Sequence, residues 1–126
     1  MTKLKKFGFF YDDVKANKTD EANIKHELSE LMRDDPHPME QNILHYLNGG
    51  RNIAYIMGPS EDFLAPSKKN IRPPHIYTDG TWAWTSDVMY YVEKYHIQLP
   101  DDFLAHMERN KWHCPRVDKI DRNDLN

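Results

Sequence analysis

This sequence lacks the features of a disulfide-stabilised, secreted or membrane-spanning protein. Cys114 is the single cysteine among 126 residues, so no internal disulfide can form. No apolar run approaches the roughly 18 residues of a membrane-spanning helix. The N-terminal lysines are followed only by the short segment 7–10, not by the apolar core of a signal peptide. We therefore expect a cytoplasmic protein that makes no contact with a membrane.

A strong charge of either sign is also missing. The chain has 17 lysine and arginine residues and 20 acidic residues, for a formal net charge of -3. Because nucleic-acid-binding proteins usually carry a basic face, we expect no direct contact with nucleic acid. Aromatic residues make up 12% of the chain, enough to oppose disorder. We predict one domain over residues 1–126, with an arm or edge strand at 1–18 and a loose tail at 113–126.

Four segments carry apolar residues at helical spacing. They begin near Asp20, Pro38, Ser86 and Pro100, which all suit the first positions of a helix. The apolar positions of the four segments include Ile24, Leu28 and Leu31; Ile43, Leu44 and Leu47; Val88, Tyr91, Val92 and Tyr95; and Phe103, Leu104 and Met107. The sequence thus predicts about four helices.

The strongest local pattern is Asp79-Gly80 between two β-prone segments. A two-residue Asp-Gly loop favours a type I′ turn, which sets the register of a hairpin. In that register Thr78 faces Thr81 and Tyr77 faces Trp82. One face then carries His75, Tyr77, Trp82 and Trp84, and the other carries Ile76, Thr78, Thr81 and Ala83. We expect helices to cover the aromatic face, because cross-strand aromatic pairs stabilise a sheet.

The remaining segments complete the predicted fold. Residues 53–57 are typical of a buried strand, and residues 58–74 form a long irregular stretch that is a candidate binding loop. Together the elements predict an α+β protein. Its sheet is small and mainly antiparallel, with about three strands including the Asp79-Gly80 hairpin, and it packs with the helices.

No group of residues meets the requirements of a catalytic, metal or cofactor site. His106, His113 and Cys114 are the closest potential zinc ligands, but their spacing matches no zinc pattern. Cys114 also lies away from any helix N-terminus that would lower its pKa. Adjacent carboxylates such as Asp101 and Asp102 point apart, so they do not form a catalytic dyad. We expect a protein that is not an enzyme and holds neither a metal nor a cofactor.

Part of the chain resembles a known group of proteins. The similar positions are Glu40, Ile43, Tyr46-Leu47, Gly50, Asp79-Gly80-Thr81-Trp82-Ala83-Trp84, Asp87, Tyr90-Tyr91-Val92, Tyr95 and Leu99-Pro100-Asp101-Asp102-Phe103. This pattern, within residues 38–107, resembles small bacterial immunity proteins of polymorphic or contact-dependent growth inhibition toxin systems. The resemblance implies a protein that binds a cognate toxin domain, in many cases a nuclease, and covers its active site.

Partner-binding residues are expected outside the similar positions. Acidic loops steer association with a basic partner, and aromatic side chains provide anchors. The candidates are Tyr11, Asp12, Asp13, Asp34, Asp35, Glu61, Asp62 and Phe63. An alternative is a small ligand-binding domain or enzyme that uses the aromatic hairpin face and a histidine such as His75. That alternative predicts a deep pocket beside Trp84 with a polar group of perturbed pKa.

Overall fold

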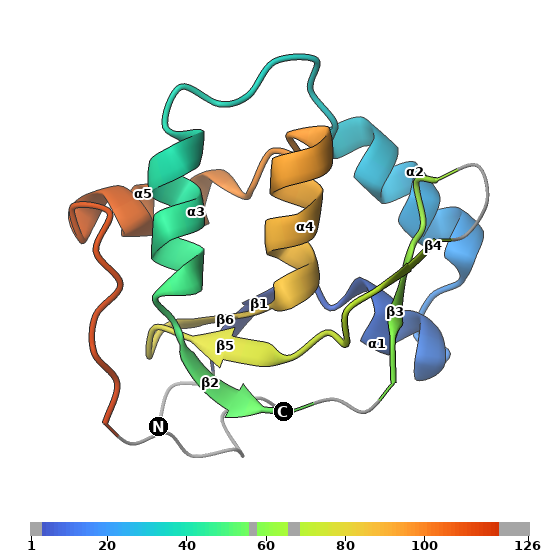
Figure 1. Cartoon of the computed structure of the whole chain (residues 1–126), viewed down its shortest axis with the longest axis horizontal. Coiled ribbons are helices and arrows are strands. Elements are labelled where there is room, and N and C mark those ends of the chain that lie inside the picture. Colours follow the sequence, from blue (N-terminus) through green and yellow to red (C-terminus); the bar gives the residue numbers. More distant parts are fainter. Residues whose placement is uncertain (1–3, 56–57, 66–68, 119–126) are drawn as a thin grey trace.

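A computed structural model describes residues 4–55, 58–65 and 69–118 of the chain (Figure 1). Within these residues there are five helices and six strands. In order they are β1 (Lys5–Phe7), α1 (Phe10–Lys15), α2 (Glu21–Leu31), α3 (Glu40–Asn48), β2 (Arg51–Ala54), β3 (Ser60–Asp62), β4 (Lys69–Ile71), β5 (Ile76–Thr78), β6 (Trp82–Thr85), α4 (Ser86–Tyr95) and α5 (Asp101–Arg109). The predicted helices correspond to α2, α3, α4 and α5, and the predicted α+β class is confirmed.

Four of the strands form a mixed sheet in the order β1-β6-β5-β2. β5 is antiparallel to both of its neighbours, whereas β1 is parallel to β6. The N-terminal segment therefore supplies an edge strand, one of the two structures predicted for it, and extends the sheet beyond the hairpin and β2. The strands β3 and β4 form a separate two-stranded sheet.

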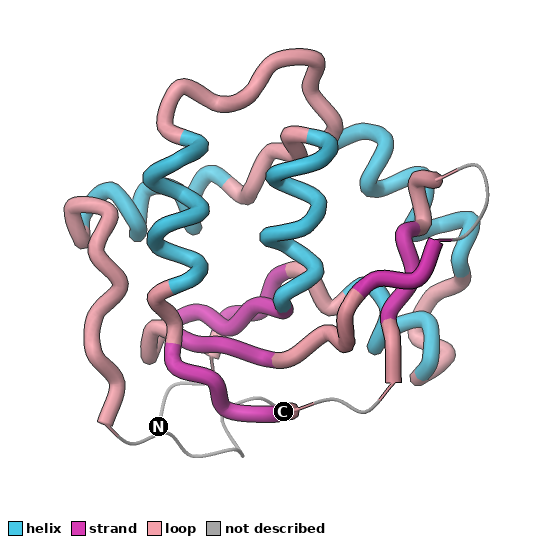
Figure 2. The backbone as a smooth tube through the Cα atoms, in the orientation of Figure 1, coloured by secondary structure: helices cyan, strands magenta, loops and turns pink. Residues whose placement is uncertain are grey.

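α3, α4 and α5 lie over one face of the four-stranded sheet, and α2 lies to the side of them (Figures 1 and 2). α3 and α4 stand side by side above the sheet, and α5 runs behind them in this view. The aromatic face of the hairpin points toward these helices, since Trp82 stacks on Phe103 of α5 with ring centroids 4.4 Å apart. Trp84 is fully buried in the same core, while Ile76 and Ala83 belong to a smaller cluster. The predicted division of the hairpin into two faces is confirmed.

The register of the hairpin differs from the prediction. Tyr77 pairs with Trp84 and Thr78 pairs with Ala83, so each partner lies two residues further along the chain than expected. A shift of one residue would have moved every side chain to the opposite face of the sheet. Because the shift is two residues, the side chains keep their predicted faces.

The turn of the hairpin is centred one residue later than predicted. Gly80 has a φ of 95°, and neither Asp79 nor Thr81 has a positive φ. A positive φ at the first central residue alone is the pattern of a type II′ turn, not of type I′. Oδ1 of Asp79 accepts hydrogen bonds from the backbone N–H groups of Thr81 and Trp82 at 2.8 and 2.7 Å. These bonds favour the shifted turn over the predicted one.

The predicted N-terminal arm also contains a helix, α1, which the sequence does not predict. Phe10 begins this helix, is 7% exposed, and meets the ring of Tyr91 edge-on at a centroid distance of 5.6 Å. Asp12 and Asp13 lie in the first turn, where the helix dipole favours acidic side chains. With only six residues, α1 is too short to show a clear helical period.

The prediction that residues 58–74 are irregular is wrong, because this stretch contains β3 and β4. Ser60 pairs with Ile71, and Glu61 pairs with Asn70. In β3 the buried side chains are Ser60 and Asp62 rather than apolar residues. A strand that buries polar side chains lacks the hydrophobic alternation by which strands are predicted.

Candidate partner-binding site

The segment between α2 and α3 is tied to the segment between α4 and α5. The backbone N–H of Gln98 donates to the carbonyl of Leu31 at 2.8 Å, and that of Arg33 donates to the carbonyl of Tyr95 at 3.4 Å. The Arg33 guanidinium also donates to Gln98 and to two carbonyls at the end of α2. A cation in this position is stabilised by the helix dipole. The two segments therefore form one ordered wall.

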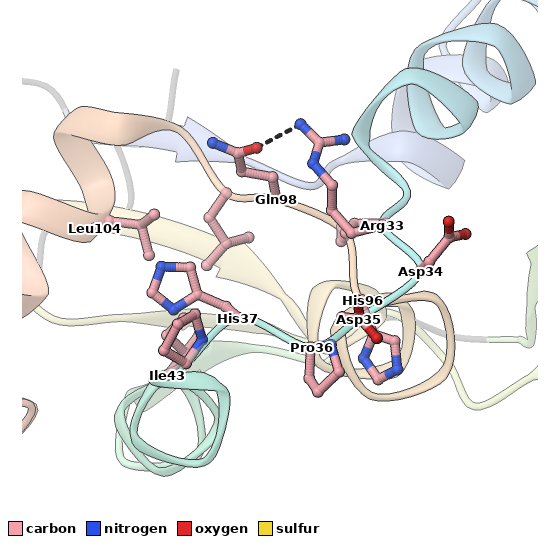
Figure 3. A pocket seen from close by; sticks show the side chains of 12 residues that line it. Arg33, Asp34, Asp35, Pro36, His37, Ile43, His96, Gln98 and Leu104 are labelled. Carbon is pink, nitrogen blue, oxygen red and sulfur yellow. Dashed lines mark hydrogen bonds between the residues drawn. The ribbon is translucent and has the colours of Figure 1, made fainter.

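A hollow of about 450 Å³ opens beside this wall (Figure 3). We call it the acidic hollow, and its lining combines the 33–38 turn with residues 96–99. Ile43, Ile97 and Leu99 line it and are each at most 4% exposed. These three aliphatic side chains belong to the packed core, and the apolar surface that the hollow exposes comes from Pro36, Pro38 and the partly exposed Leu104.

Two carboxylates lie at the edge of the acidic hollow. Asp34 and Asp35 are exposed, and neither has a hydrogen-bond or ion-pair partner among the described residues. The neighbouring guanidinium of Arg33 points toward Gln98 and away from both of them (Figure 3). The edge of the hollow therefore presents two carboxylates without a direct partner next to apolar surface.

A histidine in the acidic hollow is oriented by a buried acid. His96 ends α4 in a left-handed conformation with a φ of 54°. Its Nδ1 lies 2.7 Å from Oε1 of Glu40, which is 8% exposed. This contact joins the first turn of α3 to the end of α4. It uses Nδ1 of His96, and the other ring nitrogen, Nε2, does not contact Glu40.

The predicted partner-binding residues do not form one continuous surface. Asp34 and Asp35 lie in the loop at the top of Figure 1, whereas Tyr11, Asp12 and Asp13 lie on α1 at the opposite end. Asp12 and Asp13 line a second hollow of about 360 Å³. Burial raises the pKa of Asp12, and the charge of Asp13 adds to the increase.

Asp62 and Phe63 do not belong to an exposed binding segment, contrary to the prediction, while Glu61 is half-buried. Phe63 is 6% exposed, and the side chain of Asp62 is 0% exposed. Oδ2 of Asp62 accepts hydrogen bonds from the hydroxyl groups of Tyr90 and Tyr95 at 2.6 and 2.8 Å. The acid is therefore an internal anchor between the two-stranded sheet and α4.

The electrostatics of Asp62 follow from these contacts. Burial on its own would raise the pKa of this carboxyl. The hydrogen bonds from Tyr90, Tyr95 and the backbone of Leu64, with the Lys94 ammonium at 3.6 Å, outweigh burial and hold the pKa below its ordinary value. Tyr90 and Tyr95 of α4 thus have two roles, since their rings pack against the core and their hydroxyl groups donate to Asp62 of β3.

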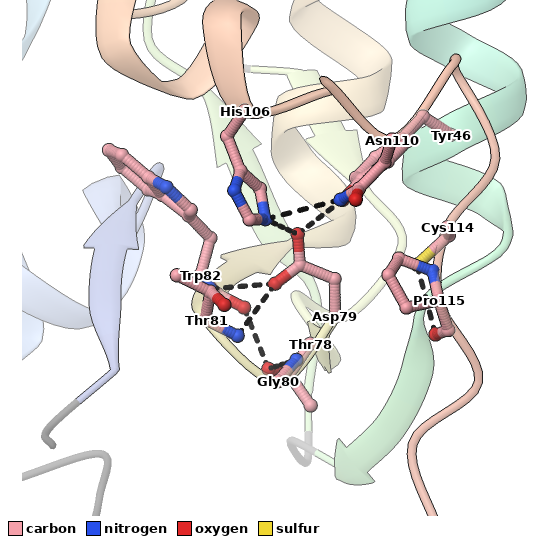
Figure 4. A network of polar contacts seen from close by, with 10 residues as sticks. All are labelled: Tyr46, Thr78, Asp79, Gly80, Thr81, Trp82, His106, Asn110, Cys114 and Pro115. Atoms are coloured by element: carbon pink, nitrogen blue, oxygen red, sulfur yellow. Dashed lines mark hydrogen bonds and ion pairs between the residues drawn. The ribbon is translucent and has the colours of Figure 1, made fainter. Parts of the chain in front are cut away.

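A second polar network joins the hairpin turn to α3 and α5 (Figure 4). Oδ2 of Asp79 accepts a hydrogen bond from the Tyr46 hydroxyl at 2.5 Å and lies 3.0 Å from Nε2 of His106. The amide of Asn110 donates to the Tyr46 oxygen at 3.0 Å. The sequence predicts only a turn at Asp79, because no sequence spacing links this residue to Tyr46 and His106, which are 33 and 27 positions away. None of the described hollows is lined by these residues.

The space beside Trp84 is filled by side chains. The rings of Tyr46 and Phe103 have centroids 6.2 and 5.7 Å from the Trp84 ring, which is 0% exposed. The described residues therefore leave no deep pocket beside Trp84, which was the pocket that the alternative interpretation predicted. His75, the histidine of the alternative interpretation, lines a different hollow beside Tyr77.

Further chemical groups offer little reactivity. Burial raises the pKa of the Cys114 thiol to about 12, and the charge of Asp79 adds to the increase, so the thiol stays protonated at neutral pH.

The described residues bring together no cluster of three or more histidine, cysteine or acidic side chains able to hold a metal ion. In the same part of the chain, no helix is both long and apolar enough to cross a membrane.

Comparisons of the chain with protein-family models, with curated proteins and with solved structures found no match.

Proposed function

We propose that this chain is an immunity protein that binds a cognate bacterial toxin domain, a nuclease, and neutralises it by covering its active site. It acts in the cytoplasm by binding and not by catalysis. The observation that carries the proposal is the acidic hollow, where Asp34 and Asp35 have no partner among the described residues and border a partly apolar surface. The resemblance of residues 38–107 to immunity proteins supports the same class.

The chemistry of the acidic hollow suits the cleft of a nuclease. Such a cleft is basic because it binds the phosphate backbone of nucleic acid. Exposed carboxylates on an inhibitor steer its approach to this charge. The apolar surface formed by Pro36, Pro38 and Leu104 can receive an anchor side chain from the partner. The bonds between the two segments also reduce the entropy lost on binding, since the wall is ordered beforehand.

The proposal assigns different roles to the eight predicted residues. Asp34 and Asp35 make the central contact. Tyr11, Asp12 and Asp13 lie on a separate surface, and Glu61 is half-buried beside the internal anchor. Asp62 and Phe63 stabilise the fold and are not part of the contact, because both are buried.

The proposal is tested by co-expression and binding with a cognate toxin domain, to be sought first in the gene next to the one that encodes this chain. The variant D34N/D35N removes both charges at the acidic hollow. The matched control D101N/D102N removes another adjacent pair, exposed in the first turn of α5. We expect the wild type and the control to protect cells and to co-purify with the toxin. D34N/D35N should bind at least about tenfold more weakly, mainly through slower association at low salt.

Two results would contradict different parts of the proposal. If the wild-type chain neither protects nor co-purifies, the immunity function is wrong. If it protects, but D34N/D35N binds as tightly as the control, the function stands and the acidic hollow is not the contact surface.

A further inference from the structure

A third and larger hollow lies between α3, α4 and the chain that leads from β4 to β5. Its volume is about 720 Å³, and it shares no lining residue with the acidic hollow. We call it the β4–α4 groove. Its volume falls in the range of roughly 300–1,000 Å³ that is typical of small-molecule sites.

The β4–α4 groove combines apolar and polar surface. Leu44, Tyr77 and Met89 are partly buried and pack against the main core, so they form an ordered apolar lining. The remaining lining residues are mainly polar and include Arg72, His75, Asp87 and Glu93. A lining of this kind suits a ligand with an apolar body and a small number of polar groups.

Asp87 is the buried acid of this groove. It is 2% exposed, and its Oδ2 accepts a hydrogen bond from the Ser60 hydroxyl at 2.6 Å. Among the described residues Ser60 is its only side-chain hydrogen-bond donor, and Oδ1 accepts no hydrogen bond that the described residues supply. Burial, opposed by Ser60 and assisted by the nearby charge of Asp12, raises the pKa of Asp87 to about 7. The carboxyl group is therefore held at the boundary between its neutral and ionised forms.

The charges around the groove favour a cation over an anion. Asp87 and Glu93 both line it, and neither has an ion-pair partner among the described residues. Arg72 is the one lysine or arginine among the lining residues, and it is exposed. The titratable and charged groups that surround Asp87 are Asp12 on α1, Arg72 and His75 between β4 and β5, and Tyr90 and Glu93 on α4. A carboxylate buried without a cation is costly, and a bound cation removes that cost.

We propose that the β4–α4 groove binds a small organic amine in its protonated form. The ammonium group donates a hydrogen bond to Asp87, and the apolar body of the ligand lies against Leu44, Tyr77 and Met89. Glu93 adds a second negative charge near the entrance. The site is separate from the proposed toxin-binding surface, because the groove and the acidic hollow have no residue in common.

Binding of this kind is coupled to the ionisation of Asp87. The ammonium group pairs with the carboxylate form, so the neutral acid must release its proton when the ligand binds. The affinity should therefore rise with pH until Asp87 is fully ionised in the free protein. Below that point it should fall by up to about tenfold per pH unit.

Benzylamine is a suitable probe, with benzyl alcohol as its uncharged counterpart of similar shape. In titrations of the ¹⁵N-labelled chain followed by NMR, benzylamine should shift the backbone amides of Asn48, Ser86 and Met89. At about pH 8 benzyl alcohol should bind at least about tenfold more weakly, which corresponds to the loss of one charge-assisted hydrogen bond. Benzylamine itself should bind more weakly at about pH 5.5, although it stays protonated.

Variants separate the site from general attraction to an acidic protein. D87N should weaken benzylamine binding by about tenfold, whereas D101N, which removes an exposed charge elsewhere, should leave it unchanged. The proposal is overturned if benzyl alcohol binds as well as benzylamine, if the shifted amides lie outside the groove, or if D87N binds normally. Should D87N fail to fold, the alcohol and pH comparisons on the wild type decide the question.

Discussion

The hydroxyl of Tyr46 in α3 donates a hydrogen bond of 2.5 Å to Oδ2 of Asp79 in the hairpin turn. Both residues are buried, at 0% and 4% exposure. Burial raises the pKa of Tyr46, and the hydrogen bond to Asp79 adds to the increase, so the phenol remains a donor. The same carboxylate closes the turn through its other oxygen. One side chain thus determines the position of the turn and fastens the hairpin to the helices.

Replacing Tyr46 by phenylalanine tests this link. Y46F removes the hydroxyl and keeps the ring against Trp84, while Asp79 retains its contact with His106. We expect a loss of about 1.5–3 kcal/mol in the free energy of unfolding, the usual range for a hydrogen bond to a charged group. Urea denaturation measures the change. Y55F is the control, because Tyr55 is 77% exposed, and a similar loss in both variants would contradict the role of Asp79.

Asp62 should stabilise the protein most strongly when it is ionised. Its pKa is lowered in the folded state, so below the ordinary carboxyl pKa the unfolded chain binds more protons than the folded chain. Its stabilisation is complete above that ordinary value of about 3.9 and is lost as the pH falls through the folded pKa. Thermal denaturation between about pH 3 and pH 7 should show this loss in the wild type. In D62N the corresponding slope should be smaller and the stability at neutral pH lower by about 1–3 kcal/mol.

Asp87 should have the opposite dependence on pH. Its pKa of about 7 in the folded state lies above the ordinary value, so between the two values the folded chain binds more protons. The free energy of unfolding should therefore fall as the pH rises from about 4 to about 7, by at most about 1.4 kcal/mol per unit. D87N should not show this fall and should be more stable than the wild type above pH 7. A variant that is less stable than the wild type at about pH 8 would contradict a destabilising buried charge.

The elements with regular apolar patterns were predictable from the sequence. Asp20 caps α2 as expected, with Oδ1 accepting from the backbone N–H of Asn23 at 2.8 Å. The faces of the hairpin were also predictable, because side chains alternate along a strand. The register of the hairpin was not predictable, because both possible turn positions place Tyr77 and Trp84 on the same face, and the pattern of side chains therefore does not distinguish them. The side chain of Asp79 decides between them, and that choice depends on tertiary contacts.

The candidate sites were predictable only in part. Asp34 and Asp35 stand out as an acidic turn, but the hollow beside them forms where Arg33 meets Gln98, 65 residues away. Asp62 was wrongly predicted to be exposed for a similar reason. The residues next to it in the sequence do not show that tyrosines of α4 bind it, including Tyr95, which lies 33 residues further along the chain. Long-range contacts of polar side chains leave no periodic pattern in a sequence.

Gly8 and Gly58 provide a matched test of how closely α4 packs against the N-terminal segment. Both have a positive φ, of 87° and 83°, so a change to alanine strains the backbone similarly at the two positions. A Cβ atom at Gly8 would lie 1.9 Å from Cγ2 of Val88, a residue that is 0% exposed, whereas a Cβ atom at Gly58 would meet nothing within 4 Å. We expect G58A to lose about 1 kcal/mol, and G8A to lose at least about 1–3 kcal/mol more from overpacking. Urea denaturation of both variants measures the difference directly.

A double variant tests whether Val88 is the cause. The change G8A should destabilise the protein less when it is added to V88A than when it is added to the wild type, because V88A removes the methyl group that the new Cβ would strike. Equal losses in G8A and G58A would mean that α4 does not approach Gly8 as closely as the structure places it.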